Sequence, residues 1–176
     1  LGFLTFGFIM WAALASCRPA DGYPNDTIIM IVVPMCVGII GAIVYFLFIQ
    51  FSEYSSAALG GLALALFICS WRYDLVIPNL IGRLGFFGGM ALVSAIAARF
   101  LPRDSPLFTT SFVGSYIIML GIDCLARKGY IAGLESLVNF NPNSQVEYTV
   151  SKLVYILLAM TLVLFFISYG WQFYFN

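Results

Sequence analysis

The sequence predicts an all-α fold, a bundle of transmembrane helices in a polytopic membrane protein. Two observations of composition and one of pattern carry this prediction. Of the 176 residues, 62% are hydrophobic and only 9% are charged, whereas a soluble domain has about 25% charged residues. The apolar residues fall into six runs, each close to the about 17–25 residues that a spanning helix needs. We therefore expect one transmembrane domain over residues 1–176, with six spans in the sequence.

Turn and polar residues divide these runs. The expected helices cover residues 1–16, 28–50, 55–71, 80–100, 107–126 and 153–173. The first run is short by a turn. Pro19, Gly22 and Pro24 exclude helix from the loop that follows it, and Pro34 falls in the second turn of its helix, where a kink is easily accommodated. The link Phe51–Tyr54 is so short that it predicts an antiparallel hairpin of the helices on either side.

The longer segment between the last two helices has its own pattern. Ile131, Leu134 and Val138 recur at helical spacing, which predicts a short amphipathic helix at about residues 130–140, lying on the membrane surface. An ordinary ordered loop is the alternative interpretation.

Small residues recur at intervals of about one helical turn. Spacing of four residues puts them on one face of a helix, where two backbones can approach closely. The formal GxxxG pair is Gly85 and Gly89. The predicted helix-packing residues are Gly38, Gly41, Gly61, Gly85, Gly89, Gly114 and Gly121. Packing within the chain is favoured over a dimer interface, because four helices carry the pattern.

Residues 28–71 and 80–126 resemble each other in pattern. Each has a helix rich in small residues, a tight link, and a second helix that begins with hydroxyl residues and contains glycine. A duplicated helical hairpin explains this resemblance, and internal repeats are common in membrane bundles. Similar composition alone explains it as well.

Two charged residues enter the apolar runs near one membrane face. Arg83 lies one turn into its helix, and Asp123 lies about one turn from the end of another. We predict an Arg83–Asp123 ion pair, or a cluster that includes Arg72, Asp74 and Arg127. An ion or proton pathway is the functional alternative, since charges inside a membrane mark such paths. Structural pairing is favoured, because both residues lie near the interface and not at the midplane.

Two signals disagree about membrane orientation. Alternating helices place six basic residues on one face and Arg99 and Arg103 on the other, and the positive-inside rule makes the more basic face cytoplasmic. The same face, however, carries the glycosylation sequon at Asn25, which is meaningful only in the lumen or outside the cell. The six basic residues are Arg18, Arg72, Arg83, Arg127, Lys128 and Lys152.

The residue types also limit the chemistry. Histidine is absent and the formal net charge is zero, so nothing indicates a proton shuttle or a nucleic-acid partner. The cysteines, Cys17, Cys36, Cys69 and Cys124, have no metal-binding spacing. We therefore predict no catalytic residues, no metal and no cofactor. The expected partners are the lipid bilayer and either other membrane subunits or a second copy of the chain.

Several segments resemble a known family. They are GFLTFGFIMWAALASCRP, LGGLALALFICSW, GRLGFFGGM and, most specifically, TTSFVGSYIIMLGIDCLARKGY at residues 109–130. Together they resemble the fungal members of the seven-transmembrane-superfamily-member-3 and transmembrane-protein-198-like domain, over nearly the whole chain. The resemblance implies a seven-helix bundle with one helix before Leu1, an amino end outside and a carboxyl end in the cytosol. It supplies no catalytic residues.

These observations favour a non-enzymatic multipass protein that acts as a scaffold or accessory subunit of a membrane complex. Small-residue packing, short loops and the lack of ionisable groups at mid-membrane support this expectation. The alternative is a small-solute or ion transporter or channel. The expected location is a membrane of the secretory pathway, which includes the endoplasmic reticulum, the vacuole and the plasma membrane.

Overall fold

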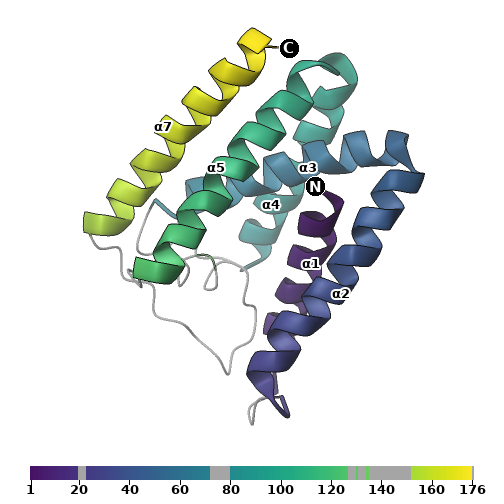
Figure 1. The fold of residues 1–176 in the computed structure, drawn as a ribbon, viewed down its shortest axis with the longest axis vertical. Helices are drawn as coiled ribbons and strands as arrows, with labels where there is room; N and C mark the ends of the chain where they lie inside the picture. Colours follow the sequence, from purple (N-terminus) through teal and green to yellow (C-terminus); the bar gives the residue numbers. More distant parts are fainter. Residues whose placement is uncertain (20–22, 72–79, 127–129, 131–133, 135–151, 176) are drawn as a thin grey trace.

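The computed structural model describes residues 1–19, 23–71, 80–126, 130, 134 and 152–175, and among these every regular element is an α-helix. The elements are α1 (Gly2–Ser16), α2 (Asp26–Leu47), α3 (Ile49–Cys69), α4 (Leu80–Phe100), α5 (Asp104–Ala126) and α7 (Lys152–Phe175) (Figure 1). All but α1 are long and apolar enough to cross a membrane. The protein is thus an integral membrane protein with a helical bundle, as the sequence predicts.

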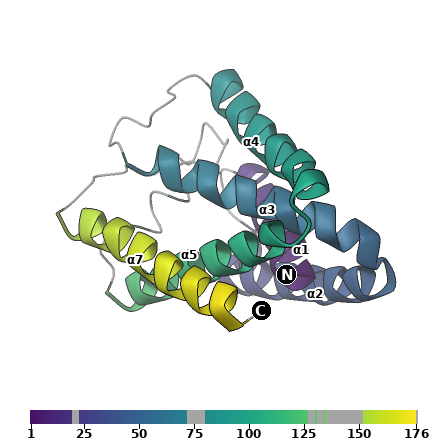
Figure 2. The ribbon, with the colours of Figure 1, turned by 90° about the horizontal axis from the view of Figure 1, so that it is seen from above.

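The described helices pack mainly in pairs, each helix with the next one that the structure describes. The most extensive contacts are α1 with α2, α3 with α4, and α5 with α7, and a further contact between α3 and α5 joins the last two pairs. Seen from above, α3 lies centrally, and α4 lies at the outer edge of the bundle beyond α3 (Figure 2). One face of α4 is therefore available to the surroundings of the bundle.

The α2–α3 connection differs from the predicted hairpin. The link expected at Phe51–Tyr54 is helical, because α3 already begins at Ile49 and only Phe48 separates it from α2. The two helices diverge from this corner and make little contact along their length (Figure 1). The physical reason is that each uses its small residues elsewhere, α2 against α1 and α3 against α4 and α5. The α4–α5 junction likewise joins helices that make little contact.

Helix starts also lie earlier than predicted. Helix α5 begins at Asp104, although Pro106 suggested a start at residue 107. Proline is tolerated in the first turn because its missing N–H would have no partner within the helix there. Helix α2 begins at Asp26 and contains the buried Pro34 without a break.

An aromatic cluster forms the core between α3, α5 and α7. The ring of Phe112 on α5 lies 5.6 Å from that of Phe67 on α3 and 5.5 Å from that of Phe165 on α7, both edge-on. Phe108 stacks on Phe112 with ring centroids 5.7 Å apart. Edge-on and offset aromatic pairs of this kind add to the free energy of burial, so the cluster fixes α7 against the rest of the bundle.

Two residues of the predicted surface segment are described, and both are buried. Tyr130 packs edge-on against Tyr116 of α5 with ring centroids 5.8 Å apart, and Leu134 belongs to a core cluster with Leu66 and Phe87. These side chains therefore face the protein and not lipid. The rest of the segment predicted at about 130–140 lies outside the described residues.

Candidate functional site

The two charged residues singled out by the sequence are both buried. Asp123 on α5 has 2% of its surface exposed, and Arg83 on α4 has 7%. Charges buried in this way need compensation from their surroundings. The Arg83–Asp123 ion pair stays a prediction. The other proposed members of the cluster, Arg72, Asp74 and Arg127, lie outside the described residues.

Helix α4 packs on α3 through one face. Its contact side carries Arg83 and Phe87, which are buried, with Met90, Ser94 and Ala98 following at helical spacing.

The crossing point with α3 is Gly61. A Cβ atom at Gly61 would lie 2.5 Å from the carbonyl oxygen of Met90 and would also collide with the side chain of Ser94. The closeness of the two backbones explains why glycine is needed here. Gly61 thus lies where α3 and α4 cross most closely among the described residues.

The opposite face of α4 is open. A Cβ atom at Gly85, Gly88 or Gly89 would have no described residue within 4 Å, and all three glycines are exposed. The large apolar residues on the same side, including Leu92 and Ile96, are exposed as well. The predicted packing role of Gly85 and Gly89 thus finds no partner among the described parts of the chain, because α3 occupies the other face.

The remaining predicted glycines divide in the same way. Gly41 on α2 and Gly2 on α1 cross so closely that a Cβ on Gly2 would lie 2.6 Å from the Gly41 carbonyl oxygen. Gly38 also contacts α1, where its Cβ would lie 2.9 Å from the Phe3 carbonyl oxygen. At Gly114 and Gly121 on α5 an added Cβ would have nothing within 4 Å in the parts of the chain that the structure describes.

A polar contact joins the three helices at the α2–α3 corner. The hydroxyl of Tyr45 on α2 lies 3.1 Å from Thr5 Oγ1 on α1, and Ser55 Oγ on α3 donates a hydrogen bond to it at 2.5 Å. Hydroxyl groups that are bonded across helices in this way stabilise membrane bundles modestly. No local sequence pattern predicted this contact, since its partners are 40 and 10 residues apart.

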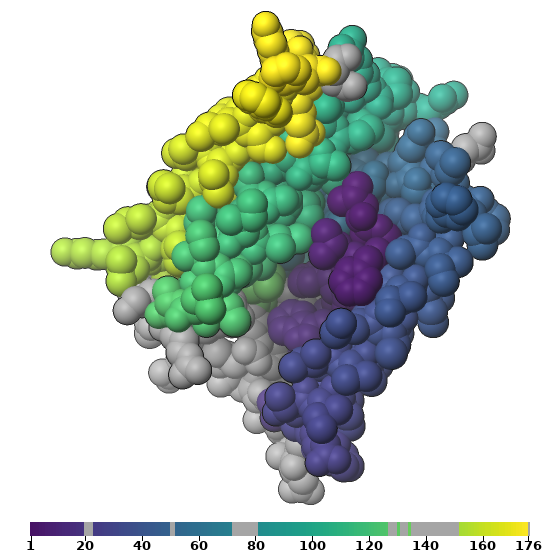
Figure 3. Space-filling model, viewed as in Figure 1, coloured from purple at the N-terminus to yellow at the C-terminus, as the bar shows by residue number. Residues whose placement is uncertain are grey.

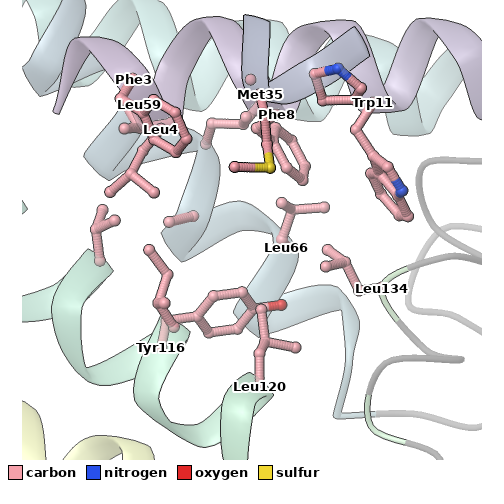
Figure 4. Close-up of a pocket in the computed structure, with 16 residues that line it drawn as sticks. Phe3, Leu4, Phe8, Trp11, Met35, Leu59, Leu66, Tyr116, Leu120 and Leu134 are labelled. Atoms are coloured by element: carbon pink, nitrogen blue, oxygen red, sulfur yellow. The ribbon is translucent and has the colours of Figure 1, made fainter. Parts of the chain in front are cut away.

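An apolar cavity lies between α1, α2, α3 and α5. Its volume is about 330 Å³, and its lining is apolar except for the tyrosine hydroxyl and the indole N–H (Figure 4). In the space-filling view α1 is recessed between α5 and α2, which leaves the surface hollowed there (Figure 3). The labelled residues around the cavity are Phe3, Leu4, Phe8, Trp11, Met35, Leu59, Leu66, Tyr116, Leu120 and Leu134.

No sequence pattern predicted this cavity. Five of its lining positions on α1 are Phe3, Leu4, Gly7, Phe8 and Trp11, which share one helix face. The periodicity of these apolar residues can be seen in the sequence, but a helix face that contacts lipid has the same apolar periodicity. Neither Arg83 nor Asp123 lines the cavity.

The loop after α1 is held by an ion pair. Arg18 binds Asp26 with a nitrogen–oxygen distance of 2.5 Å, and the Tyr23 hydroxyl donates to the Leu14 carbonyl oxygen at 3.3 Å. Asn25, the candidate glycosylation site, is exposed and precedes α2 in the left-handed conformation with φ 58°. Asparagine tolerates this conformation better than most residues. The sequon is thus accessible but directly adjacent to a helix.

The four cysteines are free thiols. Cys17, Cys36 and Cys124 are exposed, and Cys69 is buried at the end of α3. Burial of Cys69 against Leu66 and Phe87 indicates a packing role.

Comparison with known proteins identifies a family. A family model described as the TM7S3/TM198-like domain matches residues 1–173, a range that extends from α1 almost to the end of α7. No match was found among curated proteins or among solved structures.

Proposed function

The chain belongs to the TM7S3/TM198-like domain family, as residues 109–130 predicted, and we propose that it is a non-enzymatic scaffold or accessory subunit. In this proposal it acts by binding a transmembrane helix on the open face of α4. One observation carries the proposal: Gly85 and Gly89 lie side by side on an exposed face, with open space where a side chain would be. The fungal branch of the family stays a prediction.

The open face has the form of a helix-docking surface. Ile81, Gly85, Gly89, Leu92 and Ile96 follow one another by three or four residues and are all exposed. Glycine weakens a helix relative to alanine by about 1 kcal/mol, so two glycines on a face that only touches lipid would bring a cost without a benefit. In membranes, such small residues let a second backbone approach closely enough for dispersion contacts to form.

The simplest partner for this face is α4 of a second copy. Two identical faces related by a twofold axis place Gly85 and Gly89 of each copy against those of the other, as in closed symmetric dimers. The face carries no charge between Ile81 and Ile96, so like-charge repulsion does not oppose the pairing.

Energy transfer between labelled copies in liposomes tests this proposal. Donor- and acceptor-labelled protein should show transfer above that of unassociated proteins at the same density. Gly85→Leu and Gly89→Leu should raise the dissociation constant roughly tenfold, about 1.4 kcal/mol, because leucine keeps the backbones apart. Gly121→Leu introduces the same side chain at an open position on α5 and should have no effect. Wild-type transfer at the level of unassociated proteins, or equal loss in all three variants, would refute the proposal.

A location in the secretory pathway belongs to the same proposal. It is supported by the spanning helices and by the accessible Asn25 beside them. A transporter or channel is the second function that the sequence allowed. The described cavity does not favour it, since an apolar lining without Arg83 or Asp123 offers nothing to coordinate an ion.

A further inference from the structure

We propose that the cavity between α1, α2, α3 and α5 binds a single acyl chain of a membrane phospholipid. This site is separate from the α4 face and does not depend on the function proposed above. It would make a bound lipid part of the contact between the α1–α2 pair and the rest of the bundle.

The cavity lies at the depth of the hydrocarbon. Its lining on α1 runs from Phe3 to Trp11, about 12 Å at a rise of about 1.5 Å per residue. This length fits within the about 30 Å of a bilayer core. The other walls come from the second half of α3, at Leu59 to Leu66, and from the middle of α5, at Val113 to Leu120. The cavity therefore faces acyl chains and not headgroups.

Its chemistry excludes water and favours hydrocarbon. A buried water needs two to four polar partners, and an apolar cavity of about 150 Å³ stays dry and accepts benzene. This cavity, at about 330 Å³, has more than twice that volume and is lined by Leu62, Ala63 and Leu66 on one wall. If the cavity were empty, these side chains would lose their dispersion contacts on the side that faces it.

The cavity can be entered from the side. Helices α1 and α5 are not among the closely packed pairs, and the surface is hollowed where α1 lies between α5 and α2 (Figure 3). Rim residues on three helices are exposed, namely Phe3, Met35 and Ile117. The Met35 side chain extends toward the cavity from α2 (Figure 4). A flexible thioether at the rim suits an apolar ligand of variable shape.

The shape of the cavity suits an acyl chain. Its volume of about 330 Å³ extends along about two turns of α1, from Phe3 to Trp11, and a single hydrocarbon chain is long and narrow. Among the described residues the lining holds no charged side chain, so recognition rests on the chain and not on the headgroup.

Tryptophan quenching tests the inference, because Trp11 lines the cavity. The chain has three tryptophans. Changing Trp71→Phe and Trp171→Phe leaves Trp11 as the only indole. This parent protein is reconstituted in phosphatidylcholine vesicles that contain increasing fractions of phosphatidylcholine brominated on its acyl chain. We expect strong quenching of Trp11.

Filling variants separate a chain in the cavity from the surrounding lipid. Ala63→Phe places a ring in the cavity and should abolish most of the quenching, and Leu62→Phe, a smaller change, should reduce it. Leu92→Phe on the exposed face of α4 is the matched control and should leave quenching unchanged. Far-UV circular dichroism checks folding, and Leu62→Phe keeps the test decisive if Ala63→Phe does not fold. An unquenched parent, or quenching that persists in the folded filling variants, would overturn the inference.

Discussion

Replacing Gly61 with alanine tests the packing of α3 against α4 most directly. The added methyl group would lie 2.5 Å from the carbonyl oxygen of Met90, and Cβ atoms in proteins essentially never approach another atom closer than 3.0 Å. The two helices must therefore separate by at least the difference, about 0.5 Å. A backbone carbonyl inside a helix cannot rotate away as the end of a flexible side chain can.

The size of the effect follows from three contributions, two that lower stability and one that raises it. Overpacking costs about 1–3 kcal/mol, and the rigid obstacle at Met90 places this substitution near the upper value. A gap of about 0.5–1 Å also forfeits a quarter to a half of each dispersion contact across the interface. Alanine regains about 1 kcal/mol of helix propensity. We therefore expect Gly61→Ala to lower the free energy of unfolding by about 2 kcal/mol.

Unfolding by sodium dodecyl sulfate in mixed micelles, followed by far-UV circular dichroism, measures this difference. Gly121→Ala is the control, because the same methyl group would have nothing within 4 Å there. It should leave stability unchanged or raise it by up to about 1 kcal/mol. If Gly61→Ala were as stable as Gly121→Ala, the close crossing of α3 and α4 would be refuted.

Three further predictions concern polar groups. Tyr45→Phe removes two hydrogen bonds between helices and should lower the free energy of unfolding by about 1 kcal/mol; an unchanged value in the same assay would count against the contact. If Arg83 and Asp123 form an ion pair, Arg83→Ala and Asp123→Ala should be coupled by about 0.5–3 kcal/mol in a double-mutant cycle; additive effects would argue against the pair. If the α1–α2 loop is luminal, a glycosidase should shift the electrophoretic mobility of wild-type protein but not of Asn25→Gln.

The positions of the helices were largely predictable, because the length of an apolar run is a local property. The ends of the helices were less predictable, and Glu53 and Tyr54 illustrate the reason. Hydropathy marks where a chain leaves the hydrocarbon, whereas a helix continues as long as its backbone hydrogen bonds do. These polar residues were interpreted as a link, but they lie in the second turn of α3.

The orientation of each helix was not predictable. In the sequence Gly61 and Gly85 belong to the same kind of small-residue pattern, yet one touches the backbone of α4 and the other meets open space. Which face packs depends on the partner helix, and the local pattern does not specify that partner. The apolar cavity was unpredictable for the same reason, since its walls come from four helices and their rotations determine whether a gap remains.

The order in which the helices pair has a consequence for synthesis of the protein. Among the described helices, each of the three most extensive contacts joins one helix to the next, α1 to α2, α3 to α4 and α5 to α7. A ribosome that delivers the chain from its amino end therefore supplies both members of each pair before the next pair appears. The fold can be built in three successive steps, and the contact between α3 and α5 can form only after α5 has been inserted.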